Sequence, residues 1–490
     1  MKKFIAISAI AAMATMGFAS EADIKAELEA LKKEIEALKK AQAKINVKAL
    51  KKQISSLKAK TGGDNLKWNV DFRTAYDVIG YKYADGNSDW NQILTNRLWL
   101  GMAYAPKDNI VFKGLISYYK AYGQLPAPQQ GYNYFDWIVN ETPNPSGELR
   151  VKEAYWLYFG DKFLGADIPY TVSVGRRPAT DGLLVNYRED QKAKSPIGHI
   201  INTEFDGASV GLTLENVIDI PGFYLKFCMG RGLTNASTRY ASIQRNGNFY
   251  QITSNKDSEY TKLDNWDNTD LFGIIFKPYD DGQYSVTTTA FKAWHLPGLS
   301  DMGNGVPMDG IYSFEQLGDL YGAAISFKAE GIGDGINDFL DETNAFVSFA
   351  WSKTDPESDK TMLGSDDKES GTSVYVGANW PCQLMENARM GVEYNHGSKH
   401  WRSFTYGEDT LAGSKLAARG DAYEAWITKE LIGKTLTAQL RYTYINYKYT
   451  GSQAFFGDGG TPIKIEDANA LGMNPIDKAQ DIRFYVRYRY

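Results

Sequence analysis

Hydrophobic and polar residues alternate without interruption through the last ten residues of the chain, DIRFYVRYRY. Side chains of a β-strand point alternately to its two faces, so this pattern predicts a strand with one apolar face and one charged face. The apolar face comprises Ile482, Phe484, Val486, Tyr488 and Tyr490, and the charged face comprises Asp481, Arg483, Tyr485, Arg487 and Arg489. A soluble sandwich would leave such a terminal strand as an exposed edge. In a transmembrane barrel the apolar face meets lipid, the arginines meet water in the lumen, and closure removes the edge.

The same alternation recurs along most of the chain and predicts about sixteen strands, an even number as in single-chain bacterial barrels. We expect them near 69–79, 95–104, 111–119, 149–159, 170–176, 206–214, 222–229, 269–278, 283–294, 318–330, 340–352, 372–380, 387–397, 418–429, 434–450 and 481–490. The predicted fold class is therefore all-β, a transmembrane antiparallel β-barrel.

The predicted connections between these strands alternate in length. The short ones lie at 106–109, 161–169, 216–221, 279–282, 331–338, 381–386 and 430–433, and the long ones near 120–148, 177–205, 231–268, 295–317, 353–371, 398–417 and 451–479. Short turns at one end and long loops at the other are typical of outer-membrane barrels, whose short turns face the periplasm. A soluble sandwich gives no reason for loop lengths to alternate in this way.

The first sixty residues follow a different pattern. A lysine pair precedes an apolar run that ends at Phe18, which predicts a signal peptide over residues 1–19. Residues 20–60 place apolar residues at heptad spacing among Glu, Lys and Ala, with 11 lysines and 6 acidic residues. This predicts a basic α-helical coiled coil, which we place in the periplasm and expect to be trimeric. Residues 61–490 are assigned to the barrel.

Composition agrees with a barrel and offers little for catalysis. The 490 residues have a mean hydropathy of −0.40 and include 32 tyrosines and 46 glycines, as aromatic belts at two membrane interfaces and glycine-containing turns would require. Two cysteines, Cys228 and Cys382, and four histidines form no disulfide framework, metal spacing or catalytic triad. We therefore expect no enzyme activity, no cofactor and no metal. The net charge of −5 also disfavours nucleic acid as a partner.

One long connection, from Gly175 to Gly207, combines many charges of both signs in the sequence GRRPATDGLLVNYREDQKAKSPIGHIINTEFDG. Counting the connection between the first two predicted strands, it is the third outer connection, and in general porins the third outer loop folds inward and narrows the channel. We therefore predict that residues 177–205 fold into the lumen, where charges facing each other across a narrow waist would select solutes. The predicted pore constriction comprises Arg176, Arg177, Asp181, Arg188, Glu189 and Asp190. An ordinary solvated surface loop is the alternative.

Arginines recur on the polar face of the predicted strands, which is the face toward the lumen. These predicted lumen-wall residues are Arg73, Arg97, Arg389, Arg441, Arg483 and Arg487. In the same assignment Asp71, Glu393 and Glu424 also point inward, and the barrel segment as a whole is acidic. Because wall charges act on a solute at shorter range than loop charges, we expect a weak preference for anions.

The signal peptide, the coiled coil and the stretches GRRPATDGLLVNYRED and SPIGHIINTEFDG together resemble an epsilonproteobacterial outer-membrane porin-like family of unknown function. The similarity runs from about Asn65 to Tyr490, and Gly175 to Gly207 is its most specific part. A coil before a sixteen-stranded barrel is also similar in architecture to phosphate-selective porins, whose arginine ladder conducts anions. The first resemblance implies an outer-membrane barrel and brings no catalytic residues.

We therefore expect an outer-membrane porin, a homotrimer in contact with outer-membrane lipid, that lets small hydrophilic solutes pass by diffusion. Two alternatives remain open. The lysine-rich coil could tether the outer membrane to the cell wall, with the barrel as its anchor. The barrel could also be a substrate-specific channel, in which lumen aromatics such as Trp99 stack on the solute. A tether needs no open lumen, so conductance separates it from a pore.

Overall fold

The computed structural model describes residues 66–124, 149–178, 182–191, 194–235, 243–246, 249–252, 267–301, 312–333, 335–405, 410–454 and 457–490. The chain divides into two compact units, Met1–Asn65 and Leu66–Tyr490, and every described residue belongs to the second. The predicted signal peptide and coiled coil therefore lie outside the described residues, and both stay predictions.

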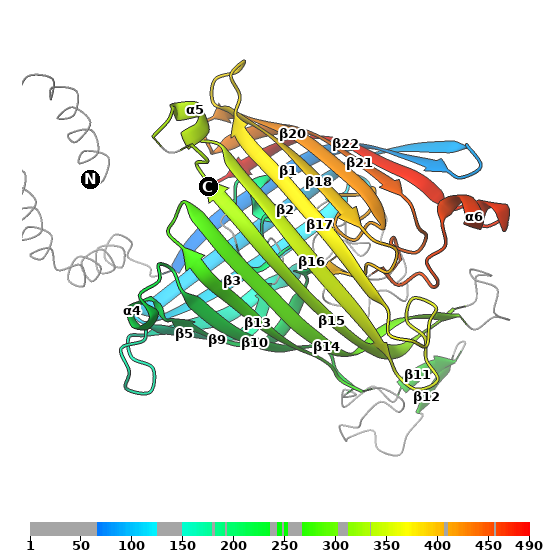
Figure 1. The fold of residues 1–490 in the computed structure, drawn as a ribbon, viewed down its shortest axis with the longest axis horizontal. Helices are drawn as coiled ribbons and strands as arrows, with labels where there is room; N and C mark the ends of the chain where they lie inside the picture. Colours follow the sequence, from blue (N-terminus) through cyan, green and yellow to red (C-terminus); the bar gives the residue numbers. More distant parts are fainter. Residues whose placement is uncertain are drawn as a thin grey trace, which may run out of the picture. The chain divides into compact units, whose positions relative to one another are not determined.

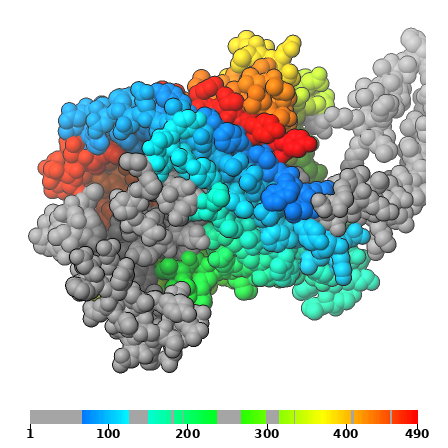
Figure 2. Space-filling model, turned by 180° about the vertical axis from the view of Figure 1, so that it is seen from behind, coloured from blue at the N-terminus to red at the C-terminus, as the bar shows by residue number. Residues whose placement is uncertain are grey.

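Sixteen antiparallel strands close into one barrel (Figure 1). They are β1 (Leu66–Tyr83), β2 (Ser88–Lys107), β3 (Ile110–Ala121), β4 (Arg150–Gly160), β5 (Tyr170–Pro178), β9 (Glu204–Thr213), β10 (Tyr224–Leu233), β13 (Thr269–Asp280), β14 (Tyr284–Asp301), β15 (Tyr312–Glu330), β16 (Asn344–Pro356), β17 (Ser370–Pro381), β18 (Ala388–Gly397), β20 (Gly420–Ile432), β21 (Leu436–Tyr447) and β22 (Ile476–Arg489). Each strand pairs with its neighbours in chain order, and β22 closes the sheet against β1. Figure 2 shows this seam from behind, with β22 in red beside β1 in blue.

The predicted all-β antiparallel barrel of sixteen strands is confirmed, because each predicted strand overlaps one barrel strand in the expected order. The turns that contain α4 (Glu215–Ile218) and α5 (Asp338–Asp341) lie at one end of the barrel (Figure 1). The opposite end carries α6 (Ile465–Ala470) and the hairpin of β11 (Ile243–Asn246) and β12 (Phe249–Ile252). Two connections at that second end, 84–87 and 302–311, are short, since the strands that flank them are longer than predicted.

The two faces of the wall have opposite chemistry. Along β22, Phe484 is 48% exposed on the outside, whereas Arg483 is 0% exposed on the inside. Large apolar side chains are exposed around the rest of the outer wall, among them Phe112, Trp156, Phe349 and Leu440. This distribution is the reverse of that in a soluble domain, in which apolar side chains face inward. No helix among the described residues has the length and apolarity to cross a membrane.

Side chains and loop segments fill part of the barrel interior. The connection between β5 and β9 contains β6 (Gly182–Leu183), a 3-10 turn at Val185–Tyr187, β7 (Lys194–Ile197) and β8 (Ile201–Asn202). In the connection between β18 and β20, β19 (Phe404–Thr405) pairs in parallel with β8. These two connections are called the β5–β9 loop and the β18–β20 loop below.

Candidate functional site

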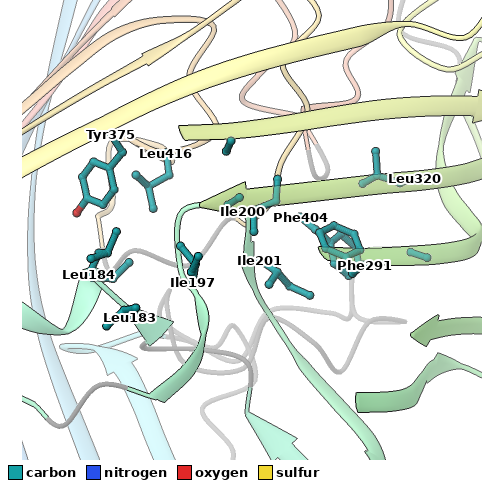
Figure 3. Close-up of a cluster of buried hydrophobic side chains, with 14 of the residues drawn as sticks. Leu183, Leu184, Ile197, Ile200, Ile201, Phe291, Leu320, Tyr375, Phe404 and Leu416 are labelled. Atoms are coloured by element: carbon teal, nitrogen blue, oxygen red, sulfur yellow. The ribbon is translucent and has the colours of Figure 1, made fainter. Parts of the chain in front are cut away.

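The β5–β9 loop packs on one side against an apolar part of the inner wall (Figure 3). Leu184 and Ile200 are both fully buried. The Ile197 amide donates a hydrogen bond to Oγ1 of Thr289 on β14 at 3.2 Å. This apolar cluster comprises Leu183, Leu184, Val185, Ile197, Ile200, Ile201, Phe205, Leu271, Phe291, Ala293, Leu296, Leu320, Ala324, Phe346, Ala350, Tyr375, Trp401, Phe404 and Leu416.

The loop meets charged wall residues through its 3-10 turn. Arg188 lies with its Nη1 2.8 Å from Oε1 of Glu424 on β20. Glu189 receives a hydrogen bond from Nη1 of Arg487 at 3.0 Å and lies 3.6 Å from Nη1 of Arg441. Neighbouring loop residues of opposite sign thus each meet a wall residue of the complementary sign. Because these buried charges are in direct contact, they stabilise the position of the loop.

Glu424 is the centre of this group of charges. Its carboxylate lies 2.7 Å from Nζ of Lys415 in the β18–β20 loop and accepts a hydrogen bond of 2.7 Å from the Thr443 hydroxyl. Lys415 also contacts Glu393 of β18. One wall carboxylate therefore holds cations from both inward loops. We call Arg188, Glu189, Lys415, Glu424, Arg441 and Arg487 the charge cluster.

The six arginines predicted to line the lumen face inward in different surroundings. Arg483 contacts Asp77, and Arg487 donates to Asp71 as well as to Glu189. Arg389 is partly exposed, beside Glu342 in the turn that contains α5. Arg73 lies over the rings of Tyr485 and Tyr119, at 5.4 and 5.8 Å, and Arg97 lies over Trp99 at 3.6 Å. The side chain of Trp99 is thus covered by a protein cation, which leaves that ring face closed to a solute.

The other predicted constriction residues lie apart from the charge cluster. Arg176 is within 3.6 Å of Glu204 and 3.7 Å of Asp206. Arg177 lies over Tyr155 at 4.5 Å and donates to the Ser173 hydroxyl. Asp190 is half exposed and lies 3.3 Å from Lys434. Asp181 lies outside the described residues. The structure therefore brings Arg188 and Glu189 together with three wall residues, and places Arg176, Arg177 and Asp190 elsewhere.

The β18–β20 loop is a part of this interior that the sequence did not reveal. Arg419 donates to the carbonyls of Trp401 at 3.0 Å and Thr450 at 2.8 Å, and its burial lowers the pKa of the guanidinium to about 10. Arg402 lies 2.9 Å from Asp458 in the connection between β21 and β22. Together with the pairing of β8 and β19, these contacts join the β5–β9 loop, the β18–β20 loop and the connection between β21 and β22. The only sequence signal was the presence of large apolar residues such as Trp401 in a long polar loop.

His199 shows how completely the β5–β9 loop is packed. Its Nδ1 and Nε2 lie 2.9 and 2.8 Å from the hydroxyls of Ser348 and Ser373 on the wall. Burial lowers the pKa of the imidazole to about 3, so the ring is neutral at physiological pH. With no exposed face it offers no general base to a substrate. Among the described residues, no cluster of His, Cys, Asp and Glu has the arrangement of a metal site.

Comparisons with known proteins give a family. A family model described as "Protein of unknown function (DUF3373)" matches residues 87–490. No protein of curated function matches the sequence. An anion-selective porin from Comamonas acidovorans is 10% identical, with 87% of this chain and 100% of that chain covered and a TM-score of 0.46. OmpT, an outer membrane protein of Vibrio cholerae, is 11% identical, with 88% and 99% covered and a TM-score of 0.44.

A complex of OmpF from Salmonella typhi with daunomycin is 10% identical, with 88% of this chain and 99% of that chain covered and a TM-score of 0.44. At these identities and TM-scores, the likenesses give no information about solutes or selectivity.

Proposed function

The chain belongs to the DUF3373 family, and we propose that it is an outer-membrane porin through which small hydrophilic solutes diffuse. The observation that carries this proposal is the chemistry of the two barrel faces. Apolar side chains such as Phe484 are exposed on the outside of a closed sheet, and charged side chains such as Arg483 line the inside. Lipid is the solvent that matches the first face and water the solvent that matches the second. The outer membrane is the proposed location, with its lipid as partner.

The proposed path runs beside the two inward loops, and the function is passage without catalysis. The charges of Arg177, near the end of β5, and of Asp190, in the β5–β9 loop, remain outside the charge cluster and are the charges that a passing solute would meet. The weak preference for anions predicted from the wall arginines is part of the proposal. Arg483 and Arg487 contribute less to this anion preference than unpaired arginines would. Each contacts an acidic neighbour, and such a pair produces little net electric field in the lumen.

A substrate-specific channel is the second candidate, and one observation favours it. The two inward loops pair through β8 and β19 and share the apolar cluster, in which Ile200 and Trp401 are fully buried. Loops packed to this degree keep one shape, because protein interiors resist deformation. A fixed, narrow path would discriminate among solutes more strongly than a wide one. The envelope tether, in contrast, depends on residues 20–60, outside the described part of the chain.

Single-channel conductance in planar bilayers tests the proposal, with the reversal potential measured under a salt gradient. The pore predicts stepwise conductance that leans toward anions, and three equal substates would support the proposed homotrimer. Arg177→Glu should shift the reversal potential toward cations. Lys353→Glu, on the outer face of β16, is the control and should leave it unchanged. Arg176 is unsuitable, because its reversal would place a third carboxylate beside those of Glu204 and Asp206.

The folded state of each protein is checked by the change in electrophoretic mobility on heating. A folded barrel without conductance would exclude the diffusion pore and leave the tether, which binding of the coil to cell wall would then test.

A further inference from the structure

A small cavity lies between the β5–β9 loop and the wall strands β9, β10, β13 and β14. Its volume is about 40 Å³, enough for a few atoms. The loop contributes Ser195 and Ile201, and the wall contributes Arg177, Lys226, Leu271 and Phe291. Two cations and several apolar side chains therefore face one space. This cavity is separate from the charge cluster, which involves β20 to β22.

Lys226 is buried beside the cavity and has no acidic partner among the described residues. It is 7% exposed, and its Nζ donates to the Ser195 hydroxyl at 3.1 Å. Three lysines are buried in the described part of the chain, and the other two pair with glutamates: Lys152 with Glu204 at 3.0 Å, and Lys415 with Glu424 at 2.7 Å. A buried ammonium without a counter-charge is costly, since a neutral hydroxyl replaces only part of its hydration.

Arg177 adds a second positive charge near Lys226. Its described contacts are the Tyr155 ring at 4.5 Å and the Ser173 hydroxyl, and no described carboxylate lies within ion-pair distance. The adjacent Arg176, by contrast, lies close to Glu204 and Asp206. Arg177 and Lys226 line the same cavity, so their like charges repel each other. An anion between them would remove this repulsion and supply the missing counter-charge.

The apolar side of the cavity restricts which anion fits. Ile201, Phe205 and Phe291 face it and belong to the apolar cluster. They cannot donate hydrogen bonds, so a fully hydrated or multiply charged anion would lose hydration there without compensation. A small anion with one charged end and a short apolar end would satisfy both sides. The volume excludes sugars and nucleotides unless the loop moves.

We propose that this cavity is a binding site for a short-chain monocarboxylate. The carboxylate would lie between Lys226, Arg177 and the Ser195 hydroxyl, and the alkyl end would lie against Ile201, Phe205 and Phe291. This inference deepens the proposed porin function, because it gives the substrate class for a site in the channel wall. A charge-assisted hydrogen bond to each cation supplies the affinity, and apolar burial supplies the preference for an alkyl chain.

Isothermal titration of the folded, detergent-solubilised full-length chain with acetate, a monocarboxylate of four heavy atoms, tests the site. We expect saturable binding that Lys226→Met weakens by about tenfold or more, as the loss of a hydrogen bond to a charged group predicts. Arg177→Gln should weaken it similarly, whereas Lys226→Arg, which keeps the charge, should retain most of it. The matched control is Lys353→Met, the same side-chain change on the outer face of β16. Heat-modifiable mobility verifies that every variant is folded.

The outcomes separate this inference from the proposed function. Acetate binding in a barrel without conductance would leave the site intact and exclude the pore. A conducting barrel that shows no acetate binding, or binding that Lys226→Met leaves unchanged, would overturn the site. Equal competition by chloride and acetate would overturn the assignment to monocarboxylates, because the apolar side would then contribute nothing.

Discussion

The β5–β9 loop is held by two regions of the barrel interior that differ in their physics. On one side, the apolar cluster holds Leu184 and Ile200 by contact area alone (Figure 3). On the other, the charge cluster holds Arg188 and Glu189 through ion pairs with Glu424 and Arg487. Apolar burial is non-directional and grows with area, so several side chains can share it. An ion pair is directional and depends on one partner.

Because the two regions use different kinds of contact, they should respond differently to mutation. Loss of an apolar side chain leaves a cavity whose neighbours can relax in part. Loss of a charged partner leaves the remaining charge buried without compensation, which costs more. The cost of losing the Glu424 carboxylate is larger still, because Lys415 and Arg441 contact the same carboxylate as Arg188. The charge cluster should therefore be the more sensitive of the two regions, although it contains fewer residues.

The largest expected effect is that of Glu424→Gln. The amide keeps the shape of the side chain but removes the negative charge beside Arg188, Lys415 and Arg441. We expect the loop to lose about 3–5 kcal/mol of docking free energy, the usual cost of breaking a buried ion pair. Native-state hydrogen exchange of amides in 182–191 would measure the loss.

Lys434→Ala is the control for that variant. Lys434 lies 3.3 Å from Asp190, but both side chains are largely exposed. An exposed pair contributes at most about 1 kcal/mol, so exchange in 182–191 should change little. If both variants had equal effects, the burial of the charge cluster would not be the reason for its importance.

Ile200→Ala should have the next largest effect. Ile200 is 0% exposed at the centre of the apolar cluster, and its truncation should cost about 2–4 kcal/mol of docking free energy. The rate of amide hydrogen exchange in residues 194–202 should rise, while the amides of the barrel strands stay protected from exchange. Ile200→Val, which removes one methylene group, is the graded control and should cost about 1 kcal/mol. An Ile200→Ala effect above that of Glu424→Gln would reverse the ranking of the two regions.

Acidification should weaken the apolar region selectively. The docked state holds the pKa of His199 at about 3, and an undocked, solvated His199 would titrate near 6.5. His199 therefore supports docking fully above pH 6.5, and this support is lost as the pH falls from 6.5 toward about 3. At pH 5 the loss is about 2 kcal/mol, from a difference of about 1.5 pH units.

Hydrogen exchange in 194–202 at pH 7.5 and pH 5, corrected for the intrinsic pH dependence of exchange, would measure this effect. His199→Gln should remove the pH dependence, because the amide does not titrate. His400, which is partly exposed beside Glu369, provides the matched control, and His400→Gln should keep the pH dependence. Loop protection that stays constant between the two pH values in the unmodified chain would contradict this assignment.

The faces of the wall could be predicted residue by residue. Arg483 and Phe484 lie on opposite sides of β22, as the alternation of the last ten residues indicated. The lumen side of Arg73, Arg441 and Arg487 followed from the same reasoning. It succeeded because side-chain direction in a strand depends on position alone, with no knowledge of the neighbouring strand.

Partners of these residues could not be predicted. The sequence indicated that arginines and a few acidic residues share the lumen face, but not that Arg487 meets Asp71 and Glu189 or that Arg97 covers Trp99. Pairing of the β5–β9 loop with the β18–β20 loop also had no local signal, since β8 and β19 contain two residues each. No local pattern indicates that Lys226 is buried without an acidic partner in the described part of the chain.

By itself, the sequence determined that the chain forms a closed antiparallel barrel with an apolar outside and a charged inside, because a repeat of two residues carries that information within each strand. Only the tertiary structure decided which charges compensate one another. Arg188 and Glu424 are 236 positions apart, and no periodic pattern connects residues across that distance. Their contact depends on how far a loop reaches into the barrel, which is a property of the closed sheet and the packed loops together.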